Sequence, residues 1–408
     1  MYRKFAWKYF RAKKSANAIN IIAWVTVSVI AFATCCQLLV LSVFNGLEGL
    51  VKSLYGDFYT DIKITPSSGK TFFLSPEKIA ELKQQPLVAN ISLVAEEKAL
   101  LQNPETASQT VVTIKGVDDN YVNVSGVPLH IGKKPFNTGT LEQPGLIVGS
   151  GIKSKADITL NDALPSDSLV IILPKKNVDN NDPLQSISEG NIKTTASFTL
   201  QQEFDDNYVF SNLDFVKQQL ALDTNEYSAV EIKVKQAAKM AEARSKLQQL
   251  LGNNFIVQTR YQQNTSLYNT MKTEKWAIFA VLTLILIVAA FNIISALTML
   301  VLEKENDISV LQSMGASRPA IRKIFLAEGL LIGVVGTITG LLLATIICVL
   351  QMKYKFIPLS GGSFLINYFP VKMIALDYVL VAGVTLLISL IAAWFPAMKA
   401  SSQSVQLR

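Results

Sequence analysis

The chain has 408 residues, half of them apolar, and a formal net charge of +7. Its one histidine is His130, which excludes a zinc site built from several histidines. Gly69-Lys70-Thr71 is not a phosphate-binding loop, because Ile64 stands where the motif needs its first glycine. We therefore predict a chain with no catalytic site, no metal site and no cofactor of its own.

Four long runs without Asp, Glu, Lys or Arg decide the class of the protein: 15–47, 276–302, 329–352 and 378–398. About 20 apolar residues cross a bilayer as a helix, and the backbone in lipid must satisfy its own hydrogen bonds. The sequence therefore predicts a membrane protein with four transmembrane helices, at 18–46, 275–302, 324–352 and 376–398.

The basic residues before the first span predict the orientation. They are Arg3, Lys4, Lys8, Arg11, Lys13 and Lys14, and no acidic residue lies among them. Because short cationic segments stay in the cytoplasm, we expect both termini there. The segment 1–17 is expected to be an amphipathic helix in the cytoplasmic interface, 303–323 a cytoplasmic segment, 353–375 a short external loop and 399–408 a cytoplasmic tail. The positive charge indicates contact with anionic lipid rather than nucleic acid.

The polar stretch 47–274 predicts a large mixed α/β domain outside the membrane, between the first and second spans. Alternating or β-branched runs predict strands at 61–65, 111–117, 146–148, 169–173, 196–201, 229–234 and 255–259. Helical periodicity predicts helices at 75–84, 214–222 and 236–251, so that 229–259 forms a βαβ unit. The segment 174–194 interrupts this pattern with Pro174, Asn181, Pro183 and Gly190, which favour a surface loop.

A short charged segment follows the second span. Its charged residues are Glu303, Lys304, Glu305 and Asp307, and acids are favoured at the start of a helix. Ile308, Leu311 and Met314 recur at a spacing that places them on one helix face, and Gly315 is placed to end the helix. A short capped helix with an apolar stripe suits docking into a groove on another protein. The alternative is a simple connecting loop.

Several of these segments carry a family resemblance. The stretch 286–294 (LIVAAFNII), Glu303-Lys304 with Asp307-Ile308, then Leu311 and Met314-Gly315-Ala316, resemble the permease subunits of the lipoprotein-releasing (Lol) ABC transporters. That family lies within the wider group that includes MacB and FtsX. The segment FAWKYFRAKK before the first span and FLAEGLLIG at the start of the third are also similar to the family.

The resemblance implies a non-catalytic subunit of the bacterial inner membrane that transmits motion from a separate ATPase, which would bind ATP and Mg and dock on 303–315. It implies a second permease protomer, identical or related, and a periplasmic position for the α/β domain. Lipoproteins would leave the outer leaflet of the membrane and pass to a periplasmic carrier.

The resemblance also implies two binding regions. The acyl chains would lie in contact with membrane lipids between the first two spans, against Val40, Val43, Phe44, Ile278, Phe279 and Leu282. A hairpin that captures the carrier would occupy 174–194, by position alone.

Two other functions fit the same architecture. One is a MacB-like permease that exports peptides or drugs through an outer-membrane channel. The other is an FtsX-like signalling subunit that controls a cell-wall hydrolase. Lipoprotein release is favoured by the match at LIVAAFNII.

Overall fold

A computed structural model describes residues 17–132, 134–160, 168–176, 186–358 and 368–402. The chain divides into two compact units. One contains the described parts of Met1–Leu50, Asn269–Ser360 and Ile366–Arg408, and the other is built mainly from Val51–Tyr268. The predicted helix 1–17 and the predicted tail 399–408 fall largely outside the described residues.

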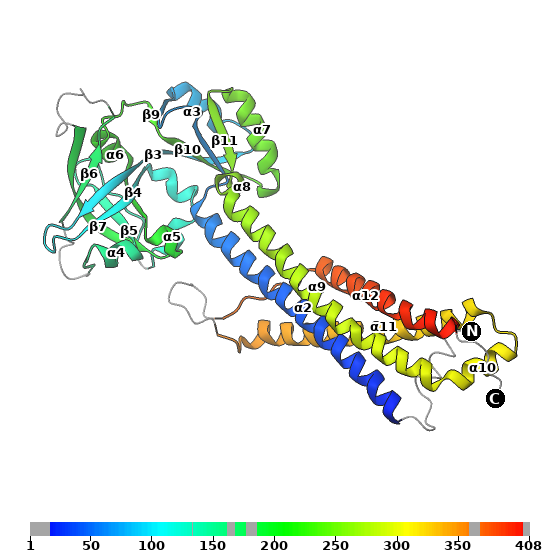
Figure 1. The fold of residues 1–408 in the computed structure, drawn as a ribbon. Coiled ribbons are helices and arrows are strands. Elements are labelled where there is room, and N and C mark those ends of the chain that lie inside the picture. The colour runs from blue at the N-terminus through cyan, green and yellow to red at the C-terminus, as the bar shows by residue number, and fades with distance from the viewer. Residues whose placement is uncertain (1–16, 133, 161–167, 177–185, 359–367, 403–408) are drawn as a thin grey trace. The chain divides into compact units, whose positions relative to one another are not determined.

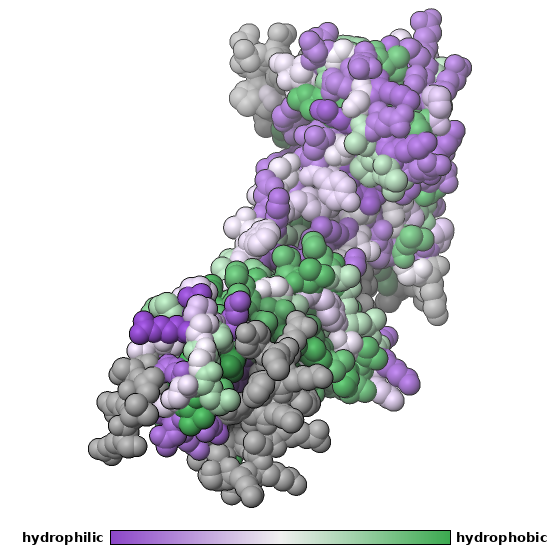
Figure 2. All heavy atoms as spheres, turned by 90° about the vertical axis from the view of Figure 1, so that its right-hand side faces the viewer, coloured by the Kyte–Doolittle hydropathy of each residue, from purple (hydrophilic) through white to green (hydrophobic). Residues whose placement is uncertain are grey.

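The first unit is helical (Figure 1). Its elements are α2 (Asn17–Phe58), α9 (Thr265–Glu303), α10 (Glu305–Ser313), α11 (Arg318–Tyr354) and α12 (Ala375–Ser402). The four long helices are long and apolar enough to cross a membrane. Figure 2 shows hydrophobic side chains gathered over this unit, whereas the surface of the α/β domain is mainly hydrophilic. The prediction of four transmembrane helices is confirmed.

The long helices extend beyond the charge-free runs. Helix α2 continues to Phe58 and α9 begins at Thr265, although the predicted spans end at 46 and begin at 275. The physical reason is that lipid excludes charge but does not end a helix. Each helix therefore continues without a break into residues that belong to the second unit.

Glycines allow α11 to approach its neighbours closely. A Cβ atom on Gly340 would lie 2.5 Å from the carbonyl oxygen of Ala31 in α2, and one on Gly333 would lie 2.6 Å from Cβ of Ser389 in α12. Small residues bring transmembrane helices into backbone contact. Gly333 and Gly340 therefore have a packing role in the helical unit.

The second unit contains a nine-stranded sheet in the order β11-β1-β10-β3-β4-β8-β5-β7-β6. Its strands are β1 (Ile62–Pro66), β3 (Val88–Gln102), β4 (Gln109–Val117), β5 (Gly145–Gly149), β6 (Ser168–Pro174), β7 (Ile187–Phe198), β8 (Tyr208–Asn212), β10 (Ala229–Val234) and β11 (Phe255–Thr259). The far end of β3 also pairs with β6, so β3, β4, β8, β5, β7 and β6 form a closed ring of paired strands.

Six α-helices and a small second sheet also lie within the described residues of this domain. The helices are α3 (Pro76–Lys83), α4 (Ser150–Lys155), α5 (Gln202–Asp205), α6 (Leu213–Gln219), α7 (Met240–Leu251) and α8 (Arg260–Gln263), and β2 (Phe72–Phe73) pairs with β9 (Glu226–Tyr227). The predicted βαβ unit is confirmed as β10, α7 and β11, with β1 lying between the two strands. The mixed α/β class is therefore confirmed.

Two predictions in this domain are wrong. The strand expected at 196–201 is β7, which begins at Ile187 and ends at Phe198. The loop expected over 174–194 is correspondingly shorter, because β6 reaches Pro174 and pairs there with Ile187. The alternating burial of β7 explains the error, since its polar residues occupy the exposed face of a half-buried strand.

Candidate functional site

The charged segment after the second span forms a helix of its own. Helix α9 ends at Glu303, Lys304 bridges the two helices, and α10 begins at Glu305. Glu305 and Asp307 occupy the first turn, where the helix dipole favours negative charge. The ammonium of Lys304 lies 3.2 Å from the carboxylate of Asp307, which ties the bridge to α10.

Helix α10 ends in the manner that the sequence predicts. Gly315 has a φ of +91°, a conformation that favours glycine. Its N–H donates to the carbonyl of Gln312 at 2.9 Å, and the N–H of Ala316 donates to the carbonyl of Leu311 at 2.9 Å. This pair of bonds is a Schellman motif, which stops the helix and turns the chain towards α11.

The predicted apolar stripe of α10 is divided between two faces. Ile308 is 3% exposed and packs with Val301, Ile321 and Phe325, so it belongs to the protein's own core. Met314 is 79% exposed, and Val310, four residues earlier, is 59% exposed. Leu311 lies half-buried between them. The exposed apolar side chains of α10 are therefore Val310 and Met314, which we call the outer face of α10, and Ile308 is excluded from it.

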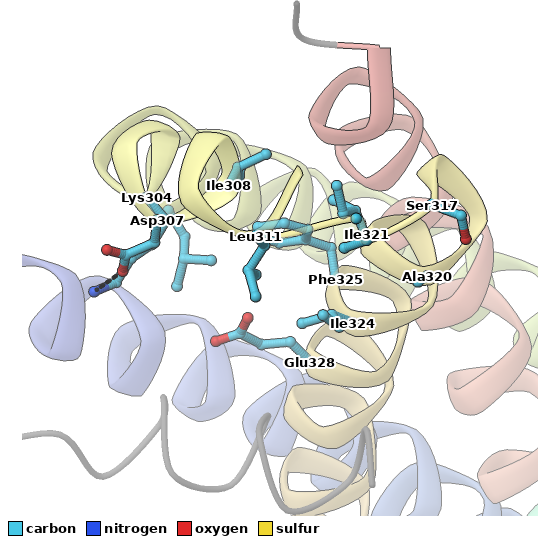
Figure 3. A pocket seen from close by; sticks show the side chains of 13 residues that line it. Lys304, Asp307, Ile308, Leu311, Ser317, Ala320, Ile321, Ile324, Phe325 and Glu328 are labelled. Atoms are coloured by element: carbon cyan, nitrogen blue, oxygen red, sulfur yellow. Dashed lines mark ion pairs between the residues drawn. The ribbon is translucent and has the colours of Figure 1, made fainter. Parts of the chain in front are cut away.

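A cavity of about 390 Å³ lies beneath α10, against the first turns of α11 (Figure 3). Its walls include Leu300, Ile308, Leu311, Ile324 and Phe325, and its polar residues include Lys304, Asp307, Ser317 and Glu328. Sequence reasoning missed this cavity because its residues come from three separate helices. The one signal was Glu328, which stands at the edge of an otherwise charge-free run.

The residues expected to contact acyl chains lie on two neighbouring helices. Val40, Val43 and Phe44 are on α2, and Ile278, Phe279 and Leu282 are on α9. The two helices meet at this level, because the side-chain amide of Gln37 donates to the hydroxyl of Thr283 at 3.2 Å. Val40 is 39% exposed and the other five are half-buried. These six side chains therefore provide apolar surface on both helices, at the level where the two helices meet.

A polar cluster that sequence reasoning missed lies next to this apolar surface. The amide of Asn45 donates to Asp377 at 2.6 Å and accepts a hydrogen bond from Lys275 at 2.8 Å. Lys275 also lies 3.4 Å from Asp377, whose side chain is buried. The cluster joins α2, α9 and α12 at one point. Asn45 within a charge-free run was the available signal.

The residues expected in the carrier-binding hairpin lie partly in strands and partly outside the described residues. Pro174 ends β6, and Asn181 and Pro183 lie outside the described residues. Gly190 is buried in β7, where a Cβ atom would lie 2.8 Å from the ring of Phe215. Gly190 therefore has a packing role in the sheet.

The end of α2 is anchored in the α/β domain by aromatic packing. The ring of Phe58 stacks on Phe204 at 3.9 Å and meets Tyr208 edge-on at 4.6 Å. The buried ammonium of Lys115 lies 5.5 Å from the Phe58 ring and 2.7 Å from the carboxylate of Glu231. Burial alone would lower the pKa of Lys115, but attraction to Glu231, Tyr121 and Glu96 together outweighs it and raises the pKa. The cation is thus held charged within the core.

The start of α9 is anchored through the preceding helix α8. The guanidinium of Arg260 lies 2.7 Å from Asp61, and the backbone N–H of Arg260 donates to the carbonyl of Asp61 at 2.9 Å. The side-chain amide of Gln263 donates to the carbonyl of Thr60 at 2.9 Å. The short segment after α2 and the segment before α9 are therefore bonded to each other.

Lys70, Thr71 and His130, which the sequence analysis excluded from catalytic or ligand-binding motifs, have structural partners. Lys70 forms an ion pair with Glu97 at 2.7 Å, and Thr71 donates to Glu226. His130 lies 3.0 Å from Asp57. Within the described ranges, no group of three or more His, Cys, Asp or Glu residues is placed to hold a metal ion.

Comparison with known proteins identifies both parts of the chain. The family model of the MacB-like periplasmic core domain matches residues 23–250, and that of the FtsX-like permease C-terminal region matches residues 279–405. Among curated proteins, LolE of Haemophilus influenzae, a lipoprotein-releasing system transmembrane protein, is 24% identical over 97% of this chain and 96% of its own length. LolC of Xylella fastidiosa is 23% identical over 97% of this chain and 95% of its own length.

Two solved structures are similar to part of the chain. The periplasmic region of MacB from Actinobacillus actinomycetemcomitans covers 54% of this chain and 98% of its own, with 9% identity and a TM-score of 0.35. The extracellular domain of YknZ from Gram-positive bacteria covers 48% of this chain and 99% of its own, with 14% identity and a TM-score of 0.31.

The family model of the MacB-like core domain covers more than half of the chain, and the FtsX-like model covers most of the remaining helices. The chain therefore belongs to the MacB/FtsX-type ABC permease family, and it is similar to the lipoprotein-releasing permeases LolC and LolE over almost its whole length.

Proposed function

We propose that this protein is the permease subunit of an ABC transporter that releases lipoproteins from the bacterial inner membrane. The observation that carries the proposal is the similarity to LolE and LolC over both the α/β domain and all four membrane helices. The apolar surface shared by α2 and α9 supports it, because acyl chains need apolar contact along their length.

The energy would come from a separate ATPase subunit that binds ATP and Mg and docks on the outer face of α10. Val310 and Met314 supply apolar contact there, and the Schellman motif at Gly315 holds α10 in place. Movement of α10 would pass along α9 to the α/β domain, where Arg260 and Phe58 fix the ends of α9 and α2.

The working unit would contain a second permease protomer, identical or related, with both termini of this chain in the cytoplasm. Lipoproteins would leave the outer leaflet along Val40 and Phe279 and then pass to a periplasmic carrier. The segment between β6 and β7 is one candidate for the contact with that carrier.

The test is lipoprotein location after depletion of this protein, measured by fractionation of inner and outer membranes. We expect outer-membrane lipoproteins to accumulate in the inner membrane. Normal sorting would contradict lipoprotein release. Loss of peptide or drug export would then favour a MacB-like function, and growth as unseparated chains would favour an FtsX-like one.

A further inference from the structure

A buried carboxylate lies in the cavity beneath α10. Glu328 is 4% exposed, projects from α11 and lines the cavity below Leu311 (Figure 3). No hydrogen bond or ion pair to Glu328 is present within the part of the chain that the structure describes. An acidic side chain in this position is costly unless a cation compensates it.

The other charged groups of the cavity do not supply that cation within ion-pair distance. Of its lining residues, Lys304, Asp307 and Glu328 are titratable. Lys304 is the cation that acts on Glu328 electrostatically, but its ammonium lies 3.2 Å from Asp307 at the rim. When all three groups are ionised their charges sum to −1, so one more positive group would make the cavity neutral.

The cavity and the outer face of α10 belong to the same short helix. Leu311 and Gly315 line the cavity, and Met314, which stands between them in the sequence, is 79% exposed. The walls are mainly apolar, and the volume of about 390 Å³ is within the range of small-ligand sites. A protein that rests on Val310 and Met314 would therefore contact the helix that forms one wall of the cavity.

We propose that the cavity receives a basic side chain of the ATPase subunit, whose ammonium or guanidinium group pairs with Glu328. The apolar stem of a lysine or arginine suits the walls, and the charged end suits the carboxylate. This inference rests on the proposed docking of an ATPase on α10, and it adds a second, electrostatic contact to the apolar one. The pair would lock α10 and α11 together when the ATPase is bound.

The test measures the affinity of the purified ATPase subunit for the full-length permease in lipid nanodiscs, at several salt concentrations. Glu328→Gln keeps the size of the side chain and removes its charge. We expect this variant to weaken binding about tenfold or more, and Glu328→Asp, which keeps the charge, to weaken it less. The affinity of Glu328→Gln should also depend less on salt than that of the unaltered chain. Asp307→Asn, which removes a charge at the rim of the cavity, is the control variant.

Three results would overturn the assignment. One is an unchanged affinity and salt dependence for Glu328→Gln, in a chain whose unfolding temperature shows that it is folded. Another is a greater loss with Glu328→Asp than with Glu328→Gln, which would indicate packing rather than charge. The third is that deletion of residues 2–14 abolishes the effect of Glu328→Gln, which would place the cation in this chain's own basic segment.

The proposed docking on α10 has its own readout. If Met314→Asp abolishes binding while Glu328→Gln leaves it unchanged, the electrostatic contact fails and the docking stands. If the ATPase does not bind the unaltered permease, the proposed function itself fails.

Discussion

The ammonium of Lys275 in α9 lies 3.4 Å from the buried carboxylate of Asp377 in α12. The side-chain amide of Asn45 forms hydrogen bonds with both residues. Asp377 also stands in the first turn of α12, where the helix dipole favours its charge. Three membrane helices thus share one ionic cluster, next to the apolar surface of α2 and α9.

Removal of one partner from this cluster should destabilise the helical unit. Lys275→Met leaves the charge of Asp377 with a neutral amide as its remaining side-chain partner. Because Lys275 is 29% exposed, we expect about 1–3 kcal/mol rather than the full cost of a broken buried pair. Thermal unfolding in nanodiscs measures the change, with the exposed Lys272→Met on the same helix as the control. Equal unfolding temperatures for the two variants would contradict a stabilising pair.

The close contact of α11 with α2 gives a second prediction. Gly340→Ala places a methyl group 2.5 Å from the carbonyl oxygen of Ala31, so the helices must separate. We expect a loss of about 1–3 kcal/mol, as for other overpacked positions. Gly383→Ala in α12 is the matched control, since no atom lies within 4 Å of its new methyl group. Similar unfolding temperatures for the two variants would show that the helices do not depend on this contact.

Much of the fold was predictable because lipid and strand pairing leave strong signals. Charge-free runs locate the four spans, and β10 and β11 were predicted with the bounds that the structure shows. Strand β3 was missed because its residues AEEKALL favour a helix. This segment instead pairs with β4 and with the distant strand β10, and such tertiary pairing overrides local propensity.

The candidate site was predictable only in outline. Spacing placed Ile308, Leu311 and Met314 on one helix, but periodicity does not say which side faces the protein's own core. Glu328 and the Asn45 cluster were missed for a related reason. Glu328 and Asn45 each stand as one polar residue beside or within an apolar run, and the role of each depends on residues from other helices.

The division of α10 into two faces predicts different effects for neighbouring substitutions. Met314→Asp and Val310→Asp should abolish association with the ATPase, because they place charge in an apolar contact, and should leave the fold intact. Ile308→Asp buries an unpaired carboxylate in the core and should instead lower the stability of the permease by several kcal/mol. Co-purification and thermal unfolding separate the two effects. Intact co-purification of Met314→Asp would remove α10 as the docking surface.

The carboxylate of Glu96 should make the α/β domain sensitive to acid. Burial alone would raise the pKa of Glu96, but attraction to Lys63 and Lys115 outweighs it, so the pKa lies below its ordinary value. A lowered pKa stabilises the folded state above the unfolded pKa of about 4.3, and that contribution is lost as the pH falls through the folded pKa. Calorimetry between about pH 6 and about pH 3 should show that stability declines less for Glu96→Gln than for the exposed control Glu81→Gln. Parallel declines would contradict the assignment.

The bond between Arg260 and Asp61 predicts a variant in which ATP hydrolysis and lipoprotein release are uncoupled. Asp61 accepts from Arg260 at 2.7 Å and from the backbone N–H of Val234 at 2.9 Å, so it connects α8, just before α9, to strand β10. Arg260→Gln weakens this connection without touching α10. We expect ATPase association and basal hydrolysis to remain, while the number of lipoproteins released per ATP falls several-fold.

Reconstituted membranes with a soluble acceptor measure both rates in this variant. Lys246→Gln is the control, because Lys246 forms an exposed pair with Glu242 within α7. An unchanged ratio of release to hydrolysis for Arg260→Gln would show that motion reaches the domain by another route. The aromatic anchor at the end of α2 is the alternative, and Phe58→Leu would then be expected to lower the ratio instead, because the Phe58 ring stacks on Phe204.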